Sequence, residues 1–346
     1  MTDTVLRVTR KPATLRGRRV AGLVAGSALL LVAVALSLAL GTRDVALLDV
    51  WSALVAPDAA NNDHLVVRDL RIPRTVNGIV VGLSLALAGT VMQGVTRNPL
   101  ADPGLLGVNA GASVFVVVAI AVLGISSPSA YVWFAFAGAA AAASIVYGIG
   151  AIGREGATPV KLVLAGTALS AGLTSIITLV LITDADTLNS FRFWSVGSLA
   201  SRDFETIGAL WPFIAVGAVL AFAVGRMLNL LSLGDDLARG LGQNLTLTRG
   251  IAAVAVVLLC GSATALAGPM VFVGLVVPHL VRPITGPDYR WILAYSAVLG
   301  PVLLLVADVI GRLIVRPAEL EAGVVIAVLG APIMIALVRR VKLAGL

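Results

Sequence analysis

Ten apolar stretches, separated by glycine, proline or charged residues, occupy almost the whole chain. An apolar run of roughly 20 residues is long enough to cross the hydrocarbon core of a bilayer as a helix. The pattern therefore predicts an all-α polytopic membrane protein with about ten transmembrane helices. The expected spans are residues 20–41, 72–95, 105–124, 132–153, 160–183, 206–228, 249–267, 270–283, 292–311 and 320–340.

The seventh and eighth spans form one apolar stretch, interrupted mainly by Gly261-Ser262 and Gly268-Pro269. Glycine and proline interrupt helices, so a boundary is expected here. The eighth span is short, and a bent connection could complete its crossing. No polar stretch is long enough to fold as a soluble domain. We therefore expect one transmembrane domain over residues 1–346, with a basic cytoplasmic segment at 1–19 ahead of the first span.

The positive charges indicate how the chain is oriented. Cytoplasmic loops of membrane proteins carry an excess of lysine and arginine. Ten spans place both termini on one side, and 17 of the 25 lysines and arginines then fall on that side. We therefore expect both termini in the cytoplasm. The net charge of +7 is explained by this topology, and no binding to nucleic acid is expected.

No expected span carries an ionisable side chain at its middle. Carriers driven by protons or sodium ions place buried Asp, Glu or His residues inside the membrane. The pattern argues against an ion-coupled secondary transporter. That class is kept as an alternative, together with a channel and with an anchor or receptor that transports nothing. The chain also lacks a phosphate-binding loop with Gly-Lys-Ser or Gly-Lys-Thr, because Lys11, Lys161 and Lys342 do not follow glycine.

The polar interruption at 229–248, between the sixth and seventh spans, has helical spacing. Leu230, Leu233, Leu237 and Leu241 recur at intervals of three and four residues. The segment is too polar to cross the membrane and too apolar to be a free loop. It is typical of short amphipathic helices at the cytoplasmic surface, with or without a protein partner.

Several ordered motifs carry a resemblance to a known family. They are RDLRIPRTVNGIVVG at 68–82, SLALAGTVMQGVTRNPLADPGLLGVNAGAS at 84–113, GDDLARGLG at 234–242, GPMVFVGLVVPHLVRPITGPDYR at 268–290, and AD with GR at 307–312 followed by LGAPI within 319–333. Together they cover the chain from about residue 65 to 338. The chain resembles the FecCD-type permeases of ATP-binding-cassette (ABC) importers for iron–siderophores, haem and cobalamin.

The resemblance implies a type II ABC importer permease in the bacterial cytoplasmic (inner) membrane. It implies a second permease subunit, identical or related, two cytoplasmic ATPase subunits and an extracytoplasmic substrate-binding protein. ATP and Mg would be bound by the ATPase, so this chain is expected to be non-catalytic and without a cofactor. Besides membrane lipid, the expected ligand is a ferric siderophore, with cobalamin and haem as alternatives.

The resemblance also assigns roles to residues of this sequence. Residues 229–248 are expected to couple to the ATPase, and the coupling residues are Leu233, Gly234, Asp235, Asp236, Ala238, Arg239, Gly240, Leu241 and Gly242. The binding protein is expected to dock on Arg71, Arg74 and Arg312, which otherwise would reach lipid phosphates or pair with Asp69 and Asp308. From side-chain type and not from the resemblance, we expect the translocation path to include the amide and hydroxyl side chains of Gln93, Asn109, Ser113 and Thr167.

Other residues have structural interpretations. His279 is expected to form a structural hydrogen bond. No metal site is expected, because the only other histidine, His64, is predicted on the opposite side of the membrane. Asp102 is expected to cap the third span, and Asp308 to pair with Arg312, four residues on.

One position departs from the family pattern. Relatives often have proline after Glu-Leu, where this chain has Glu321. The departure affects the entry to the last span and places a further carboxylate near Arg312 and Arg316.

Overall fold

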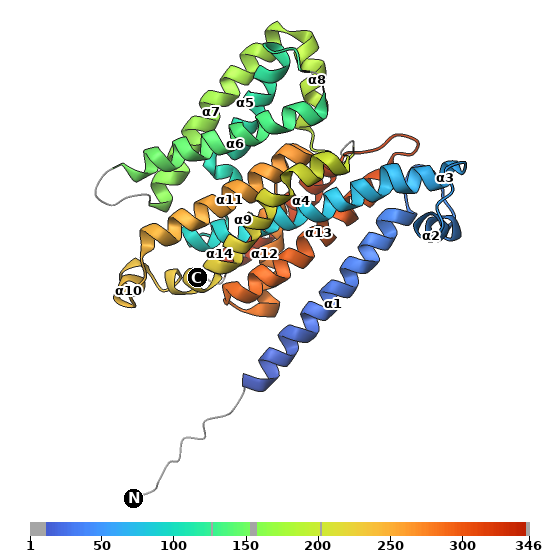
Figure 1. Cartoon of the computed structure of the whole chain (residues 1–346). Helices are drawn as coiled ribbons and strands as arrows, with labels where there is room; N and C mark the ends of the chain where they lie inside the picture. Colours follow the sequence, from blue (N-terminus) through green and yellow to red (C-terminus); the bar gives the residue numbers. More distant parts are fainter. Residues whose placement is uncertain (1–11, 126, 153–157, 201–202, 344–346) are drawn as a thin grey trace, which may run out of the picture.

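The computed structural model describes residues 12–125, 127–152, 158–200 and 203–343, and these residues form helices and no strand. Of the basic segment expected at 1–19, residues 1–11 lie outside the described residues. The fold is all-α, as the sequence predicts (Figure 1).

Seven described helices are long and apolar enough to cross a membrane. They are α1 (Pro12–Ala39), α4 (Ile72–Thr96), α6 (Pro128–Ala151), α7 (Pro159–Thr183), α9 (Phe204–Leu231), α11 (Leu245–Ala267) and α13 (Tyr289–Ile314). The other three expected spans form α5 (Val108–Ala121), α12 (Val273–Thr285) and α14 (Ala322–Leu343). Each of the ten apolar runs therefore corresponds to one helix.

The expected boundary between the seventh and eighth spans is confirmed at Gly268. This glycine has a φ of +78° and follows the last residue of α11. Phe272, directly before α12, also has a positive φ, of +69°. Two left-handed residues within five positions end one helix and redirect the chain into the next. The short α12, of 13 residues, begins three residues later than the span expected at 270–283.

Short helices connect the long ones. They are α2 (Leu47–Val55), α3 (Asn62–Leu65), the π-helix η1 (Val66–Arg71), the 3-10 helix η2 (Pro103–Leu106), α8 (Ala185–Ser195) and α10 (Asp235–Gly240). Only α10 was anticipated from the sequence. The π-helix η1 runs directly into α4, so the second span is longer at its N-terminal end than the sequence predicts.

The centre of the molecule is α4, of which 20 of the 25 residues are buried. Glycines allow its backbone to approach its neighbours closely. A Cβ atom at Gly89 would lie 2.1 Å from the carbonyl oxygen of Gly274 in α12, and one at Gly82 would lie 2.7 Å from that of Gly300 in α13. Larger side chains at these positions would force the helices apart.

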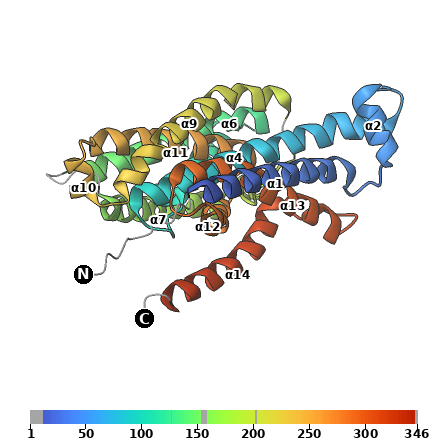
Figure 2. The same cartoon turned by 90° about the horizontal axis from the view of Figure 1, so that it is seen from below.

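The helices are arranged as a bundle with two distinct ends. Figure 1 shows α10 at one end, and α2 and α3 at the other, which are called here the α10 end and the α2 end. Helices α5 to α8 form a group beside α11 and α9, whereas α1 runs along α13 on the other side. Seen from below, α14 leaves the bundle at an angle (Figure 2).

Candidate functional site

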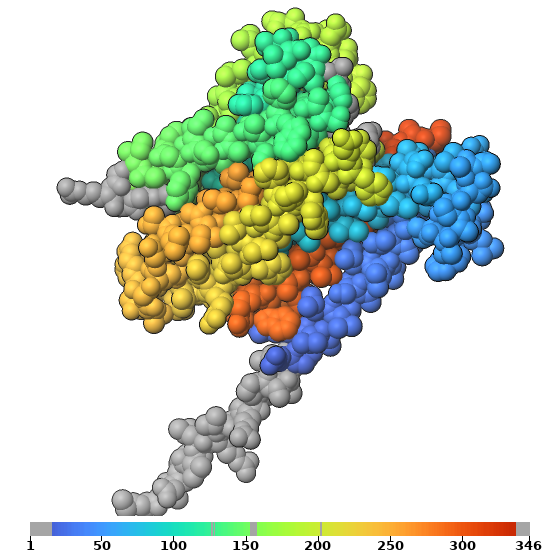
Figure 3. Space-filling model, in the orientation of Figure 1, coloured from blue at the N-terminus to red at the C-terminus, as the bar shows by residue number. Residues whose placement is uncertain are grey.

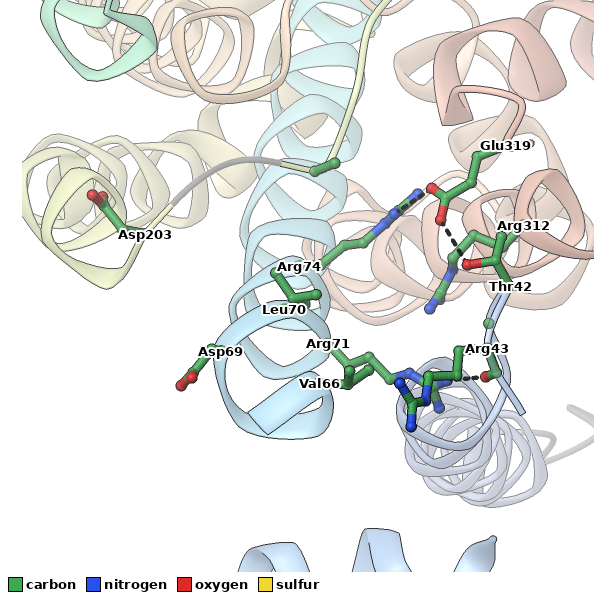
Figure 4. Close-up of a pocket in the computed structure, with 12 residues that line it drawn as sticks. Thr42, Arg43, Val66, Asp69, Leu70, Arg71, Arg74, Asp203, Arg312 and Glu319 are labelled. Atoms are coloured by element: carbon green, nitrogen blue, oxygen red, sulfur yellow. Dashed lines mark hydrogen bonds and ion pairs between the residues drawn. The ribbon is translucent and has the colours of Figure 1, made fainter. Parts of the chain in front are cut away.

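At the α2 end, Arg74 in the first turn of α4 contacts Asp308 in α13. Its Nε lies 3.0 and 3.1 Å from the two carboxylate oxygens, and its Nη2 lies 2.8 Å from Oδ1. The Asp308 side chain has no exposed surface, whereas that of Arg74 is 11% exposed. Arg74 also donates from Nη1 to Glu319, at 2.6 Å (Figure 4). One guanidinium therefore binds two carboxylates.

Arg312 shares the same buried carboxylate. Its Nη2 lies 3.0 Å from Asp308 Oδ2, which confirms the pairing predicted four residues apart. The guanidinium of Arg312 also donates to the carbonyl oxygens of Ser37 and Leu40, at the end of α1. Two guanidiniums thus neutralise Asp308, and one of them holds the last turn of α1.

Arg71 binds the same end of α1 from η1. Its Nη1 lies 2.7 Å from the carbonyl oxygens of both Leu38 and Ala39, and its Nη2 donates to the carbonyl of Arg43. The last carbonyls of a helix have no partner within the helix and carry the negative end of its dipole. Arg71 and Arg312 supply hydrogen-bond donors for these carbonyls and a positive charge beside the dipole. Both side chains are almost completely buried there.

The three arginines expected to dock a binding protein are therefore brought together by the fold. They border a cavity of about 520 Å3 together with Thr42, Asp69 and Glu319 (Figure 4). Their guanidiniums are largely engaged by internal carboxylates and carbonyls. The contact between Arg74 and Glu319 is the most exposed of them, because one-third of the Glu319 side chain is accessible. An acidic group entering the cavity would compete first at this contact.

Glu321 lies directly before α14 and begins the helix, since its carbonyl oxygen accepts from the N–H of Val324 and Val325. The departure from proline is thus compatible with a normal start of the last helix. Arg312 and Arg316 do not use this carboxylate in the described structure, because they pair with Asp308 and Asp44. The Glu321 atom Oε2 is buried without a hydrogen-bond partner among the described atoms.

At the α10 end, the expected short helix is confirmed as Asp235–Gly240. It is set off by Gly234 and Gly242, whose φ angles are +106° and +81°. The ends of the segment expected at 229–248 belong to the flanking helices α9 and α11, so the connection itself comprises residues 232–244.

The surface of this connection is apolar. The side chains of Leu233, Leu237 and Leu241 are each more than half exposed, whereas Ala238 is completely buried. A Cβ atom at Gly240 would meet nothing within 4 Å. Exposed leucines at helical spacing beside an open glycine form a surface suited to another protein.

Two consecutive aspartates of α10 differ in their contacts. Asp235 lies 2.8 Å from Arg249 in α11 and 3.3 Å from Arg97, the residue that directly follows α4. Asp236 is almost fully exposed and, among the described residues, forms an ion pair with Arg239 of the same helix alone, at 3.3 Å. Asp235 therefore joins α10 to α4 and α11, and Asp236 does not.

The four residues expected on the translocation path lie on three helices and differ in burial. Gln93 is completely buried, where it donates to the Gly274 carbonyl and accepts from Arg282. Asn109 accepts a hydrogen bond from Thr264. Ser113 is a buried residue of α5, and Thr167 is exposed on α7.

His279 has the hydrogen bond that the sequence suggests, whereas Asp102 caps the turn ahead of α5 and not α5 itself, whose N-cap is Gly107. Asp102 accepts a hydrogen bond from the Gly104 N–H and so caps η2, the helical turn ahead of α5. Burial raises the pKa of Asp102, although this hydrogen bond opposes the effect. Nδ1 of His279 lies 2.8 Å from the Leu275 carbonyl oxygen. Within the described ranges, no group of three His, Cys, Asp or Glu residues could hold a metal ion.

Known proteins resemble this chain in sequence and in fold. A model of the FecCD transport family matches residues 29–340. The chain is 43% identical to the probable siderophore transport system permease protein YfiZ of Bacillus subtilis, over 90% of this chain and 93% of that protein. It is also 43% identical, with the same coverage, to the ferric enterobactin transport system permease protein FepD of Escherichia coli.

A solved structure has the same fold. It is an inward-facing conformation of a metal-chelate type ABC transporter and superposes with a TM-score of 0.80. The two chains are 25% identical, and the match covers 92% of this chain and 98% of the other.

Proposed function

This chain belongs to the FecCD transport family and is a permease of the metal-chelate type of ABC importer, and we propose that its cargo is a ferric siderophore. The observation that carries this proposal is the 43% identity, over about nine-tenths of the chain, to permeases named for siderophore and ferric enterobactin transport. Haem and cobalamin are the alternative cargoes within the family.

The energy for transport would come from separate subunits. Because no lysine of the chain follows a glycine, the chain has no phosphate-binding loop of the usual kind. We propose that two ATPase subunits bind ATP and Mg and contact residues 232–244, where Leu233, Leu237 and Leu241 are exposed. The charge bias supports placing this end, and both termini, in the cytoplasm, although Arg7, Arg10 and Lys11 lie outside the described residues.

A second permease subunit would complete the path. Only three of the 25 residues of α7 are buried, so this apolar helix leaves most of its surface to a partner subunit or to lipid. Exposed Thr167 on α7 and half-buried Asn109 on α5 offer hydroxyl and amide groups to a chelate. Gln93 and Ser113 would have to be uncovered by helix movement, because both are buried.

The substrate-binding protein would dock at the α2 end. We propose that acidic side chains of the binding protein enter the cavity beside Arg71, Arg74 and Arg312, and that Arg74 exchanges Glu319 for an incoming carboxylate. Arginine suits this role because its planar guanidinium binds carboxylates in a bidentate manner.

Movement of α10 would be transmitted by Asp235. Because this side chain pairs with Arg97 and Arg249, a displacement of α10 by the ATPase would pull on the ends of α4 and α11. Helix α4 contacts α13, α11, α12 and α9. Its displacement would therefore reach most of the bundle and could alternate access to the path.

Uptake by the reconstituted complex tests this function. The chain, its ATPase and its binding protein are placed in liposomes, and uptake of a ferric siderophore labelled with radioactive iron is measured with haem or cobalamin as competitor. We expect uptake to require ATP, to persist when ionophores collapse the proton and sodium gradients, and to ignore both competitors. Competition by haem or cobalamin would show that the competing compound is the cargo. Uptake driven by a gradient without ATP would contradict the proposal of an ATP-driven importer.

A further inference from the structure

Helix α2 exposes an apolar face that the proposed transport function does not use. Only Val50 and Ala53 of its nine residues are buried, in a small cluster with Val45 and Val67. The large apolar side chains on the other face are exposed, and Leu48 and Trp51 are exposed by 81% and 67%. This face consists of Leu47, Leu48, Trp51, Leu54 and Val55.

These five residues form one continuous stripe. At about 100° per residue, positions 47, 48, 51, 54 and 55 fall within roughly 120° of the helix circumference. The polar residues of α2 point elsewhere, because Asp49 and Ser52 are half-buried. A helix in water would show its polar residues and bury such a stripe, so the exposed face of α2 is suited to an apolar surrounding.

The orientation of α2 is held by a chain of hydrogen bonds. The N–H of Asp58 donates to Nδ1 of His64, at 2.9 Å, so the ring proton of the neutral imidazole is on Nε2. Nε2 lies 2.9 Å from Ser52 Oγ, which donates to the carbonyl of Asp49. His64 is buried in this position. The stripe is therefore presented by a fixed helix.

The stripe lies beside the end of a candidate membrane span whose surface is also apolar. Helix α1 is a candidate span that exposes large apolar residues along its length, among them Val24, Leu31 and Val32. It ends at Ala39, and α2 begins at Leu47 beside that end (Figures 1 and 2). In the space-filling view, the segment that contains α2 forms a lobe beside the end of α1 (Figure 3). Helix α2 thus lies at the end of a candidate span whose surface is also apolar.

The surroundings of α2 match the boundary between hydrocarbon and water. Nine residues extend over roughly 14 Å and are too short to cross a bilayer. Charged residues adjoin the helix, since the side chains of Arg43 and Asp44 are exposed by 55% and 88%. Tryptophan is enriched at this depth of the membrane. Short amphipathic helices with aromatic and leucine residues on one face lie in this interfacial layer.

We propose that α2 is an interfacial helix that inserts Leu47, Leu48, Trp51, Leu54 and Val55 into the lipid leaflet at the α2 end of the bundle. It would fix the depth of the connection between α1 and η1, and with it the arginines that line the cavity. This assignment does not depend on the identity of the cargo.

Quenching of a fluorescent label tests the proposal in the full chain. Single-cysteine variants Leu48→Cys and Asp44→Cys, each combined with Cys260→Ala, are labelled with a small fluorophore and reconstituted in phosphatidylcholine vesicles. Asp44→Cys is the matched control, four residues away on an exposed loop. The fluorescence is measured with lipid brominated on its acyl chains and, separately, with iodide in the water.

We expect brominated lipid to quench the label at residue 48 roughly two-fold, and iodide to quench it little, with the opposite result at residue 44. Quenching of residue 48 by iodide, without quenching by brominated lipid, would mean that the face is in water. Protection of residue 48 from both quenchers would mean that protein covers it. Either result would overturn the proposal.

A second measurement avoids the introduced cysteines. Tryptophan fluorescence of the native chain and of Trp51→Phe is compared in ordinary and brominated vesicles. We expect the part of the emission that Trp51→Phe removes to be quenched by the brominated lipid. An unquenched Trp51 contribution would reject insertion even if the labelled variants failed to fold.

Discussion

Arg74 and Asp308 are joined by three hydrogen bonds of 2.8 to 3.1 Å between the first turn of α4 and the last part of α13. Asp308 is at the same time bound to Arg312, which holds the end of α1. One buried carboxylate therefore ties three helices together at the α2 end. Large changes at Arg74 or Arg312 would therefore disturb the packing of these helices.

Asp308→Asn should destabilise the protein. The substitution leaves two largely buried guanidiniums without their shared anion, and loss of one partner of a buried pair costs about 3–5 kcal/mol. The measurement is the thermal unfolding midpoint in detergent. Glu319→Gln is the matched control, because its carboxylate is one-third exposed and should contribute only about 1 kcal/mol or less. Equal midpoints for the two variants would contradict a central role for Asp308.

Glu319→Gln should strengthen docking of the binding protein. Removing this carboxylate frees Nη1 of Arg74 for an acidic group of the partner, and we expect a several-fold gain in affinity at low salt that shrinks as salt is added. Arg74→Gln should weaken docking by about 1 kcal/mol. The affinity is measured with the chain in nanodiscs. If neither variant alters it, the cavity is not the docking site.

Gly240→Trp should abolish binding of the ATPase without disturbing the fold. No atom lies within 4 Å of a Cβ placed at Gly240, so the isolated chain can accept the larger side chain. Gly208→Trp is the control, since Gly208 is equally open but lies near the opposite end of α9. Co-purification of the ATPase and uptake are measured for both. Normal binding and uptake by Gly240→Trp would show that α10 is not the contact.

Asp235→Asn should separate ATPase binding from transport. The variant keeps the exposed leucines but loses the ion pairs with Arg97 and Arg249, so we expect the ATPase to co-purify normally while uptake falls by roughly ten-fold, equivalent to about 1.4 kcal/mol. Asp236→Asn is the adjacent control, because the ion pair of Asp236 in the described structure is with Arg239, inside α10. Indistinguishable uptake by the two variants would refute transmission through Asp235.

The sequence by itself determined the helical content and the order of the spans. Each of the ten apolar runs became a helix, because a long apolar segment in a bilayer has to satisfy its own backbone hydrogen bonds. The break at Gly268 and the short helix at Asp235–Gly240 were also predicted from the sequence. Glycine and the spacing of the leucines affect the backbone only near their own positions. The family motifs are likewise continuous stretches of sequence. These features depend on residues close together in the chain.

Only the tertiary structure decided which side chains meet. Arg71 and Arg312 were expected at an outer surface, but they are buried on the carbonyls at the end of α1. Gln93, which was expected on the path, also joins α4 to α12 through its hydrogen bond to Gly274. The exposed stripe of α2 was not anticipated at all. Membrane helices are apolar on every face, so their periodicity does not reveal which face is covered. That choice depends on close approach between distant segments, such as Gly89 against Gly274.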